Sequence, residues 1–206
     1  MSPSGLFVAF EGGEGAGKST QVRRLAEALQ SWGHEVVTTF EPGDTPVGRE
    51  LRQILLGHQT GPLDARTEAL LYAADRAEHV ASVVQPALKR GAVCITDRYL
   101  DSSVAYQGAG RVLDPADVER ISHWATGSLL PHLTVVLDID PALGLTRFDA
   151  PADRLESEPL AFHQRVREHF LELAARSPER YLVLDAVRPV DDLAAAVLAA
   201  VTGRLS

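Results

Sequence analysis

One stretch near the start of the chain constrains its fold more than any other. Residues 12–19 read Gly-Gly-Glu-Gly-Ala-Gly-Lys-Ser, which fits the phosphate-binding pattern G-x-x-x-x-G-K-[ST] at every defined position. In such a loop the glycines let the backbone wrap around phosphate groups, and successive N–H groups and the following helix N-terminus present partial positive charge to them. The pattern therefore predicts a nucleotide-binding loop between a strand and a helix.

The flanking residues favour that strand and that helix. Residues 6–10 form a short apolar run, typical of a strand buried on both faces of a parallel sheet. The predicted helix after the loop has an apolar face formed by Val22, Leu25, Leu29 and Trp32. Gly33 stands where a C-terminal cap belongs. The alternative is a glycine-rich turn that binds nothing, and the complete pattern with its flanks disfavours it.

The loop residues are predicted to hold ATP and Mg²⁺. Lys18 adds a full positive charge, and Ser19 is expected to offer its hydroxyl to a Mg²⁺ that bridges two phosphates. The predicted nucleotide-binding set is Gly12, Gly13, Glu14, Gly15, Ala16, Gly17, Lys18, Ser19 and Thr20.

Composition and charge argue against several other classes of protein. The chain has 206 residues, 45% hydrophobic and 23% charged, which is ordinary for one globular domain with a full core. Its formal charge of −8 argues against non-specific binding of nucleic acid or acidic membranes. The single cysteine, Cys94, cannot form an intramolecular disulfide, and neither a signal peptide nor a membrane span is visible. We therefore expect a cytoplasmic protein.

Strands alternate with helices along the rest of the chain. Further strands are predicted at residues 35–40, 92–97, 133–138 and 181–185. Helices are predicted at residues 47–56 and 64–90, from Asp114, briefly from Pro141, around 162–173 and at 190–202. This order indicates an α/β fold, a single P-loop kinase domain over residues 1–206, with a five-stranded parallel sheet and helices on both faces. The polar stretch at about 147–156 is expected to form a short mobile lid.

Two of these helices carry predicted buried faces. The helix at 64–90 has an apolar stripe of Leu70, Ala74, Ala77, Ala81, Val84 and Leu88, with Glu68, Tyr72, Arg76 and His79 on another face. Pro86 is expected to kink it. The helix from Asp114 is expected to bury Val118, Ile121 and Trp124.

A second motif begins where the predicted strand at 92–97 ends, at the edge where open parallel α/β sheets bind ligands. Asp97 can hold the Mg²⁺ through water, while Arg98 can clamp a phosphate with its guanidinium group. An acid for the metal beside a cation for a second phosphate suits transfer between two phosphates.

The residues from Asp97 to Gly108 resemble the thymidylate kinase family. That family pairs this phosphate loop with a D-R-[YFH] strand end and an S-x-x-A-Y-Q-G continuation, and both are present here. Residues 41–45, 71–76, 153–156 and 184–186 look like the same family, so the resemblance covers about residues 6 to 200. It implies transfer of the γ-phosphate of ATP to dTMP, and it implies a homodimer.

The resemblance also implies roles for single residues. Tyr72 matches an aromatic position that stacks on thymine, and Arg76, one turn on, matches an arginine that hydrogen-bonds to a thymine carbonyl. Arg98 would hold the dTMP phosphate, and Tyr106 matches the residue that leaves no room for a 2′-hydroxyl. The implied substrate-binding set is Tyr72, Arg76, Arg98, Ser103, Tyr106 and Gln107. Taken alone, the two residues favour a structural interpretation, with Tyr72 as half-buried packing and Arg76 in a helix-surface ion pair, and only the resemblance reverses it.

The phosphate loop lacks an arginine that one branch of the family has, and this absence directs the search for further catalytic residues. Gly15 stands where one branch of the family has an arginine, and in the other branch the lid supplies catalytic arginines. Arg147 and Arg154 are the candidates here, although Arg147 also reads as a solvated lid charge, and Arg154 is the predicted transition-state cation. Glu14 matches an acidic position near the substrate's sugar and phosphate. The implied catalytic set is Lys18, Arg98, Arg154, Arg147 and Glu14.

Two other functions stay open at this point. A deoxynucleoside kinase phosphorylates a hydroxyl and needs a general base, for which Glu14 or Glu41 could serve. A regulatory P-loop ATPase would bind nucleotide to control a partner, and a GTPase of that kind needs an N-K-x-D motif that the chain lacks. The motif that starts at Asp97 favours the monophosphate kinase. One departure is Phe40, where the family commonly has an arginine that helps to place the substrate phosphate.

Overall fold

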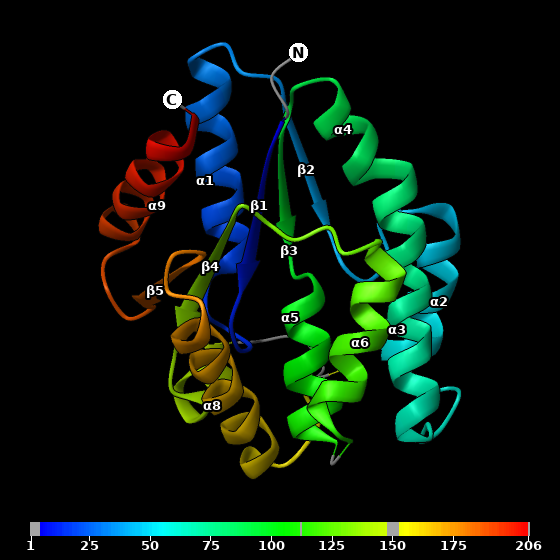
Figure 1. Cartoon of the computed structure of the whole chain (residues 1–206). Coiled ribbons are helices and arrows are strands. Elements are labelled where there is room, and N and C mark those ends of the chain that lie inside the picture. The colour runs from blue at the N-terminus through cyan, green and yellow to red at the C-terminus, as the bar shows by residue number, and fades with distance from the viewer. Residues whose placement is uncertain (1–4, 112, 148–152, 206) are drawn as a thin grey trace.

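A five-stranded parallel sheet forms the centre of the molecule (Figure 1), in a computed structural model that describes residues 5–111, 113–147 and 153–205. The strand order is β2-β3-β1-β4-β5, and every neighbouring pair is parallel. The strands are β1 (Leu6–Glu11), β2 (Val36–Phe40), β3 (Val93–Asp97), β4 (Leu133–Asp138) and β5 (Tyr181–Asp185). The predicted α/β sheet is confirmed, and the loops that follow β1, β3 and β4 leave the same edge.

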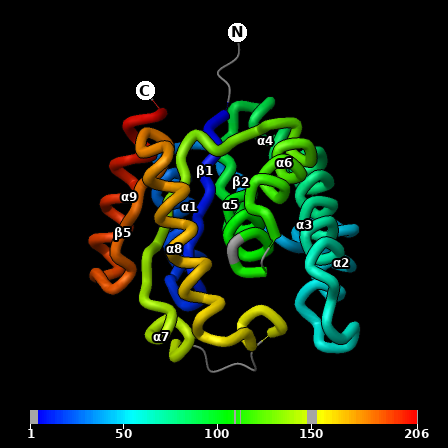
Figure 2. Tube along the Cα trace, turned by 60° about the horizontal axis from the view of Figure 1, so that its bottom comes forward, coloured from blue at the N-terminus to red at the C-terminus, as the bar shows by residue number. Residues whose placement is uncertain are grey.

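Helices cover both faces of this sheet (Figures 1 and 2). One face carries α1 (Lys18–Ser31) and α9 (Val190–Leu205). The other carries α3 (Ala65–His79), α4 (Gln85–Lys89), α5 (Leu100–Ser103) and α8 (Leu160–Arg176). Next to α3 lie α2 (Pro46–Leu56) and α6 (Pro115–Thr126), and α7 (Pro141–Gly144) follows β4. Shorter segments are the π-helices η1 (Val80–Val84) and η2 (Val104–Gly110) and the 3₁₀-helix η3 (Leu145–Arg147).

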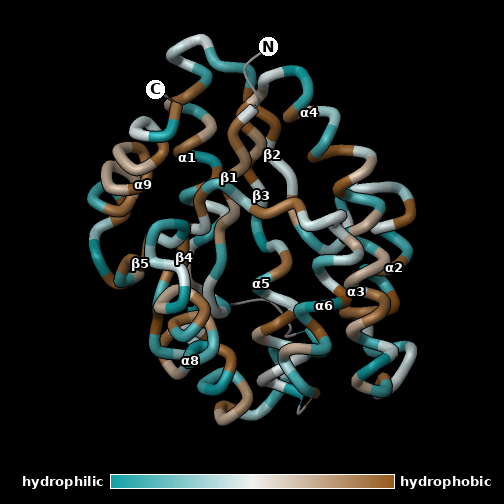
Figure 3. Tube along the Cα trace, in the orientation of Figure 1, coloured by the Kyte–Doolittle hydropathy of each residue, from teal (hydrophilic) through white to brown (hydrophobic). Residues whose placement is uncertain are grey.

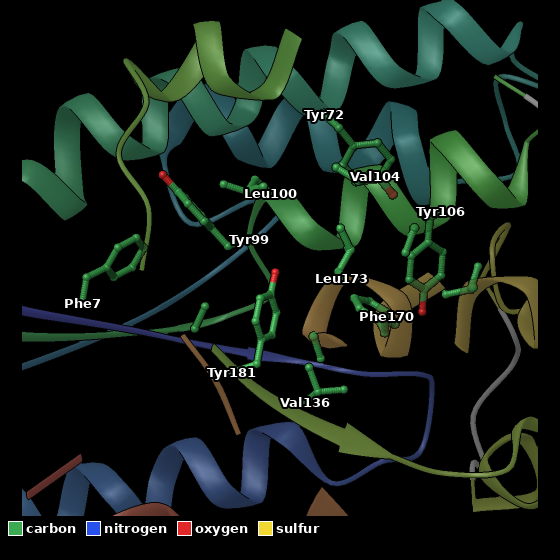
Figure 4. Packing of buried hydrophobic residues seen from close by; sticks show 14 of the residues in the cluster. Phe7, Tyr72, Tyr99, Leu100, Val104, Tyr106, Val136, Phe170, Leu173 and Tyr181 are labelled. Carbon is green, nitrogen blue, oxygen red and sulfur yellow. The ribbon is translucent and has the colours of Figure 1, made fainter. Parts of the chain in front are cut away.

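Side chains that alternate along the strands build one hydrophobic core on each face. In β1, Phe7 and Ala9 pack toward α3, α5 and α8, whereas Val8 and Phe10 pack toward α1 and α9. Figure 4 shows the first of these cores, in which the rings of Phe7 and Tyr99 meet edge to face with centroids 4.9 Å apart. Hydrophobic residues accordingly concentrate along the central strands in Figure 3. The two cores fix the strand ends that carry the candidate site.

The structure corrects the buried face predicted for the long helix. The segment is divided into α3, η1 and α4, with Pro86 in the first turn of α4. Leu70 is 55% exposed and Ala74 and Ala81 also lie at the surface, so these three form a surface stripe, called here the α3 stripe. The rest of the predicted face is at least half-buried, with Val84 fully buried. The buried residues of α3 are mostly polar: Glu68, Ala69, Tyr72, Ala73, Asp75, Arg76 and His79. Polar side chains are buried there because they bond to one another and to neighbouring loops.

Both tryptophans lie at the surface, although the sequence predicted buried positions for them. Trp124 is 84% exposed and Ile121 is only half-buried, and α6 instead buries Val118, Ser122 and Thr126. Ser122 is buried because its hydroxyl accepts a hydrogen bond from Arg76 of α3 at 3.4 Å. Trp32 is 54% exposed because α1 ends at Ser31, one residue before it.

Two further segments extend the sequence prediction. Residues 100–110, for which no helix was predicted, form α5 and η2. The predicted lid is described only at its ends, by Arg147 and by residues 153–156, and residues 148–152 lie outside the described part. Within the described residues, no helix is long and apolar enough to cross a membrane.

Candidate active site

The loop after β1 folds around its own lysine. Gly12, Gly15 and Gly17 have φ values of 129°, 68° and 87°, which glycine adopts without steric cost. Lys18 begins α1, and its ammonium group donates to the carbonyl oxygens of Gly12 at 3.1 Å and Gly13 at 3.0 Å. Burial and the neighbouring Arg98 lower the pKa of Lys18. The buried ammonium group therefore lies near a second cation, Arg98, with the carboxylates of Glu14 and Asp97 also nearby.

Position 15 has no room for a side chain. A Cβ there would lie 2.2 Å from the carbonyl oxygen of Gly144, in α7. The same approach of α7 brings Arg147, three residues further on, to donate from Nη1 to the carbonyl oxygen of Gly15 at 3.0 Å. The chain thus places an arginine from η3 beside the loop position that cannot carry one.

A hydroxyl and a carboxylate meet beside the loop. The Ser19 hydroxyl, in the first turn of α1, donates to Oδ2 of Asp97 at the end of β3, at 2.8 Å. Oxygen ligands of this kind are the ones Mg²⁺ prefers. The two residues predicted to hold a metal therefore lie together.

Two adjoining cavities open at this edge of the sheet. The larger, of about 690 Å³, is lined by residues 14–20, Asp97 and Arg147 among others. The smaller, of about 140 Å³, is lined by Tyr72 and Arg76 of α3 together with residues of α5 and η2. Four residues line both cavities: Glu14, Glu41, Arg52 and Arg98. Ligands in the two cavities would meet at these four side chains.

Arg98 forms the centre of this shared wall. Its φ of 71° is unusual for a residue other than glycine. The turn is held by the Arg98 N–H, which donates to Phe10 at 2.9 Å, and by the Thr96 hydroxyl, which donates to the Arg98 carbonyl at 2.8 Å. Its guanidinium group pairs with Glu14 and lies 4.9 Å from the centre of the Tyr106 ring. The strained turn directs the cation to where the two cavities meet.

Glu14 is held in its ionised form. It accepts hydrogen bonds from Arg98 and, at 2.8 Å, from the Tyr106 hydroxyl. Burial alone would raise the pKa of the Glu14 carboxyl, but Arg98 and Lys18 outweigh burial and lower it to about 2. A carboxylate with so low a pKa is a weak general base. Both oxygens of Glu41, the other candidate base, are engaged by Arg76 at 2.8 Å and His79 at 2.7 Å.

The smaller cavity brings together every residue of the predicted substrate-binding set, which is Tyr72, Arg76, Arg98, Ser103, Tyr106 and Gln107. Tyr72 and Tyr106 lie at one end of the core in Figure 4. Arg76 is almost fully buried and donates to Ser103 at 3.0 Å and to the Tyr99 carbonyl at 3.2 Å. The π-helical η2 carries Tyr106 and Gln107 side by side into this cavity, and π-helical segments often occur at functional sites.

Sequence reasoning missed Arg52, which lines both cavities. It donates to the Pro42 carbonyl at 2.7 Å, and its guanidinium carbon lies 5.8 Å from the centre of the Phe40 ring. The structure therefore places an arginine beside the position where Phe40 departs from the family pattern. The only signal in the sequence was a basic residue in the helix after the turn at 41–45.

The two lid arginines lie in different places. Arg147 lines the larger cavity beside the loop. Arg154 lines neither cavity, although Asp153, Leu155 and Glu156 on either side of it line the smaller one. Its Nη2 is 2.5 Å from Oε2 of Glu68, and its Nε donates to the Leu55 carbonyl at 2.8 Å. The structure therefore brings Arg147 to the phosphate loop and leaves Arg154 bound to α2 and α3.

One buried acid behind the site gives a pH-dependent prediction. Asp75 accepts the Gly43 N–H at 3.1 Å, and burial and the neighbouring Glu41 raise its pKa from 3.8 to about 6. Because the folded pKa is the higher one, this group lowers stability as pH rises from about 4 to 6, and the cost persists above pH 6. We expect Asp75→Asn, which keeps the acceptor, to raise Tm by about 3 to 6 °C at pH 8 and by less at pH 5. Thermal unfolding at both pH values tests this, and an equal difference at both would contradict it.

Comparisons with known proteins agree on one family. The thymidylate kinase family model matches residues 10–197. A thymidylate kinase of Clavibacter michiganensis is 57% identical over 197 residues, covering 94% of this chain and 93% of that protein. A thymidylate kinase of Deinococcus radiodurans is 50% identical over 202 residues, covering 97% and 98%. The crystal structure of thymidylate kinase from Ehrlichia chaffeensis superposes with a TM-score of 0.74 at 31% identity, covering 88% of this chain and 93% of that one.

Proposed function

Because the chain belongs to the thymidylate kinase family, we infer that it transfers the γ-phosphate of ATP to dTMP and releases ADP and dTDP. The chain is thus an ATP-dependent phosphotransferase with nucleotide substrates. The observation that carries this function is the shared wall between the two cavities, where Arg98 and Glu14 line both. Such a wall suits transfer of a phosphoryl group between two bound nucleotides.

We assign the larger cavity to ATP and the smaller to dTMP. The loop N–H groups and Lys18 would hold the β- and γ-phosphates. Tyr72 would stack on thymine, Arg76 would donate to a thymine carbonyl, and Tyr106 would pack against the deoxyribose. Arg98, at the junction, would hold the dTMP phosphate. Its present partner Glu14 is an anion, and an arriving phosphate would replace one charge-assisted hydrogen bond by another.

The proposed phosphoryl transfer requires cations that neutralise developing negative charge, and it requires no strong base. The attacking oxygen of dTMP is already anionic, so Glu14, with its pKa of about 2, and the fully engaged Glu41 need not remove a proton. Lys18 and Arg98 neutralise charge that develops between donor and acceptor. We propose Arg147 as the further transition-state cation, because it lies beside the loop at Gly15 whereas Arg154 does not.

The residues present fit a bound Mg²⁺. Ser19 and Asp97 place two hard oxygens in contact beside the loop. Among the described residues no three acidic, histidine or cysteine side chains form a metal cluster, so nucleotide phosphates would have to complete the ligand set. Ser19 would bind the ion directly and Asp97 through water. When bound, Mg²⁺ neutralises phosphate charge.

The metal assignment predicts a change in Mg²⁺ dependence. We expect Asp97→Asn to raise the Mg²⁺ concentration that gives half-maximal activity by about tenfold or more, because a neutral amide holds the water-bridged ion less well. The measurement is a Mg²⁺ titration of dTMP-dependent ADP release at saturating nucleotide. A large fall in kcat with an unchanged Mg²⁺ midpoint would contradict the assignment.

The function itself is tested by the choice of acceptor. The protein is incubated with ATP, Mg²⁺ and dTMP, thymidine or no acceptor, and ADP release is measured. Of the three mixtures, we expect only the one that contains dTMP to release ADP. Preference for thymidine would indicate a deoxynucleoside kinase, and acceptor-independent turnover would indicate a regulatory ATPase.

We further propose that the protein acts in the cytoplasm as a homodimer. The α3 stripe and Trp124 of the neighbouring α6 expose apolar side chains that the helical periodicity predicted to be buried, which supports an interface there. Light scattering should give the dimer mass, and Leu70→Glu should shift it toward the monomer. An unchanged mass for this variant would place the interface elsewhere.

A further inference from the structure

One buried carboxylate next to the smaller cavity has no place in the proposed chemistry. Glu68 of α3 is fully buried and lies one turn before Tyr72. Its Oε1 accepts a hydrogen bond from Nε2 of Gln107 at 3.0 Å. Gln107 is itself 1% exposed and lines the cavity assigned to dTMP. Glu68 therefore acts on a side chain of the candidate base pocket without lining that pocket.

Two arginines from distant parts of the chain hold Glu68 in place. Arg111, which follows η2, donates from Nε to Oε1 at 3.2 Å and from Nη2 to Oε2 at 3.3 Å. Arg154, from the predicted lid, places Nη2 2.5 Å from Oε2. Arg111 is fixed in turn by Glu158 and lies 5.1 Å from the centre of the Phe162 ring. The carboxylate is thus anchored by both of its oxygens.

This arrangement determines which end of the Gln107 amide faces the cavity. A carboxylate between two guanidinium groups offers only acceptors, so Gln107 must turn its NH₂ group to Glu68. Its carbonyl oxygen is then left for a ligand. If the amide rotated by half a turn, its oxygen would face the Glu68 carboxylate, and two acceptors in a buried site repel each other.

The resulting pattern matches one pyrimidine edge and opposes another. Arg76 offers only donors, and Gln107 in this orientation offers an acceptor. Thymine presents a carbonyl at C4 and an N–H at N3, which complement that pair. Cytosine presents an amino group at C4 and an unprotonated N3, which is the opposite pattern at both positions. Rotation of the Gln107 amide would remove half of the mismatch with cytosine.

We propose that Glu68, through Gln107, is a positioning residue that makes the pocket select pyrimidines protonated at N3, an inference that rests on the proposed function. Arg111 and Arg154 act through Glu68 by fixing its two oxygens. This gives Arg154 a different role from that of the transition-state cation predicted from sequence. In this role Arg154 connects the segment at 153–156 to the base pocket. The backbone N–H and the Nε of Arg154 also donate to carbonyl groups in the last turn of α2.

The proposal is tested by acceptor selectivity. In Glu68→Gln the new amide can donate or accept, so Gln107 is free to rotate. We expect kcat/KM for dTMP to fall about tenfold and the dTMP:dCMP ratio to fall at least tenfold, with KM for ATP unchanged. dUMP presents the same hydrogen-bonding edge as dTMP, so the dTMP:dUMP ratio should stay constant. Glu68→Asp, which keeps the charge but shortens the reach, should shift the ratios in the same direction and serves if Glu68→Gln does not fold.

A matched control removes a glutamate carboxylate from an arginine outside this network. Glu35 pairs with Arg90 at 3.1 Å on the surface and lines neither cavity, so Glu35→Gln should leave both ratios at their original values. If the unmodified enzyme does not phosphorylate dTMP, the proposed function fails. If it does, and the Glu68 variants keep the original dTMP:dCMP ratio, only the positioning role is wrong. A parallel loss of selectivity against dUMP would show a collapsed pocket and would also overturn it.

Discussion

Replacement of Arg98 by methionine should lower kcat/KM for dTMP by about a thousandfold while KM for ATP changes less than about threefold. Arg98 lines both cavities, and its guanidinium group pairs with buried Glu14. Loss of charge-assisted contacts to the acceptor phosphate, in the bound state and in the transition state, accounts for about 4 kcal/mol. Steady-state kinetics with each substrate varied in turn measure the effect.

The control for Arg98 is an arginine that makes a strong ion pair elsewhere. Arg167 of α8 donates to both oxygens of Asp138 at 2.6 and 2.9 Å and lines neither cavity. Arg167→Met should leave both KM values unchanged. If Arg98→Met weakened ATP binding as much as dTMP turnover and lowered Tm sharply, Arg98 would be holding its own turn rather than the acceptor.

Most of the fold could be predicted because local patterns determine it. The apolar runs and the glycine and proline positions predicted all five strands and most helices. Hydrophobic periodicity and the residues that end helices and strands can both be read from short stretches of sequence. The buried face of α3 could not be predicted in this way. Leu70 and Ala74 of its predicted apolar face lie at the surface, whereas Asp75, Arg76 and His79 are buried by hydrogen bonds to residues distant in sequence. Periodicity detects hydrophobic burial and does not detect buried polar networks.

The residues of the candidate site could likewise be predicted where they belong to continuous motifs, but not where contacts between separate elements bring them together. The phosphate loop and the motif that begins at Asp97 are continuous in sequence, and their side chains meet as their spacing implies. Arg52 and Glu68 were missed because their contacts join separate helices or loops. Motif matching alone also preferred Arg154 to Arg147, because residues 153–156 fit the family better. Only the approach of Gly144 to Gly15 shows which arginine lies at the loop.

The lid arginines give the second large prediction. We expect Arg147→Met to lower kcat by about 10² to 10³, with both KM values within a few-fold, because a cation that acts on charge developing in the transition state contributes little to ground-state binding. Arg154→Met should lower kcat much less and should instead reduce the dTMP:dCMP ratio, because its Nη2 contacts Glu68. Single-turnover rates with both variants separate chemistry from product release.

The comparison of these two variants decides how the lid supplies its charge. Arg147 already donates to the Gly15 carbonyl of the loop, so turning to a γ-phosphate bound there would cost it one hydrogen bond to a neutral carbonyl. Arg154 would have to break its ion pair with the fully buried Glu68 and its bond to Leu55, which leaves a buried carboxylate with one cation fewer. A kcat loss larger for Arg154→Met than for Arg147→Met would therefore mean that ATP and dTMP together drive that rearrangement. Arg154, which the motif predicted, would then be the transition-state cation in place of Arg147, which the geometry favours.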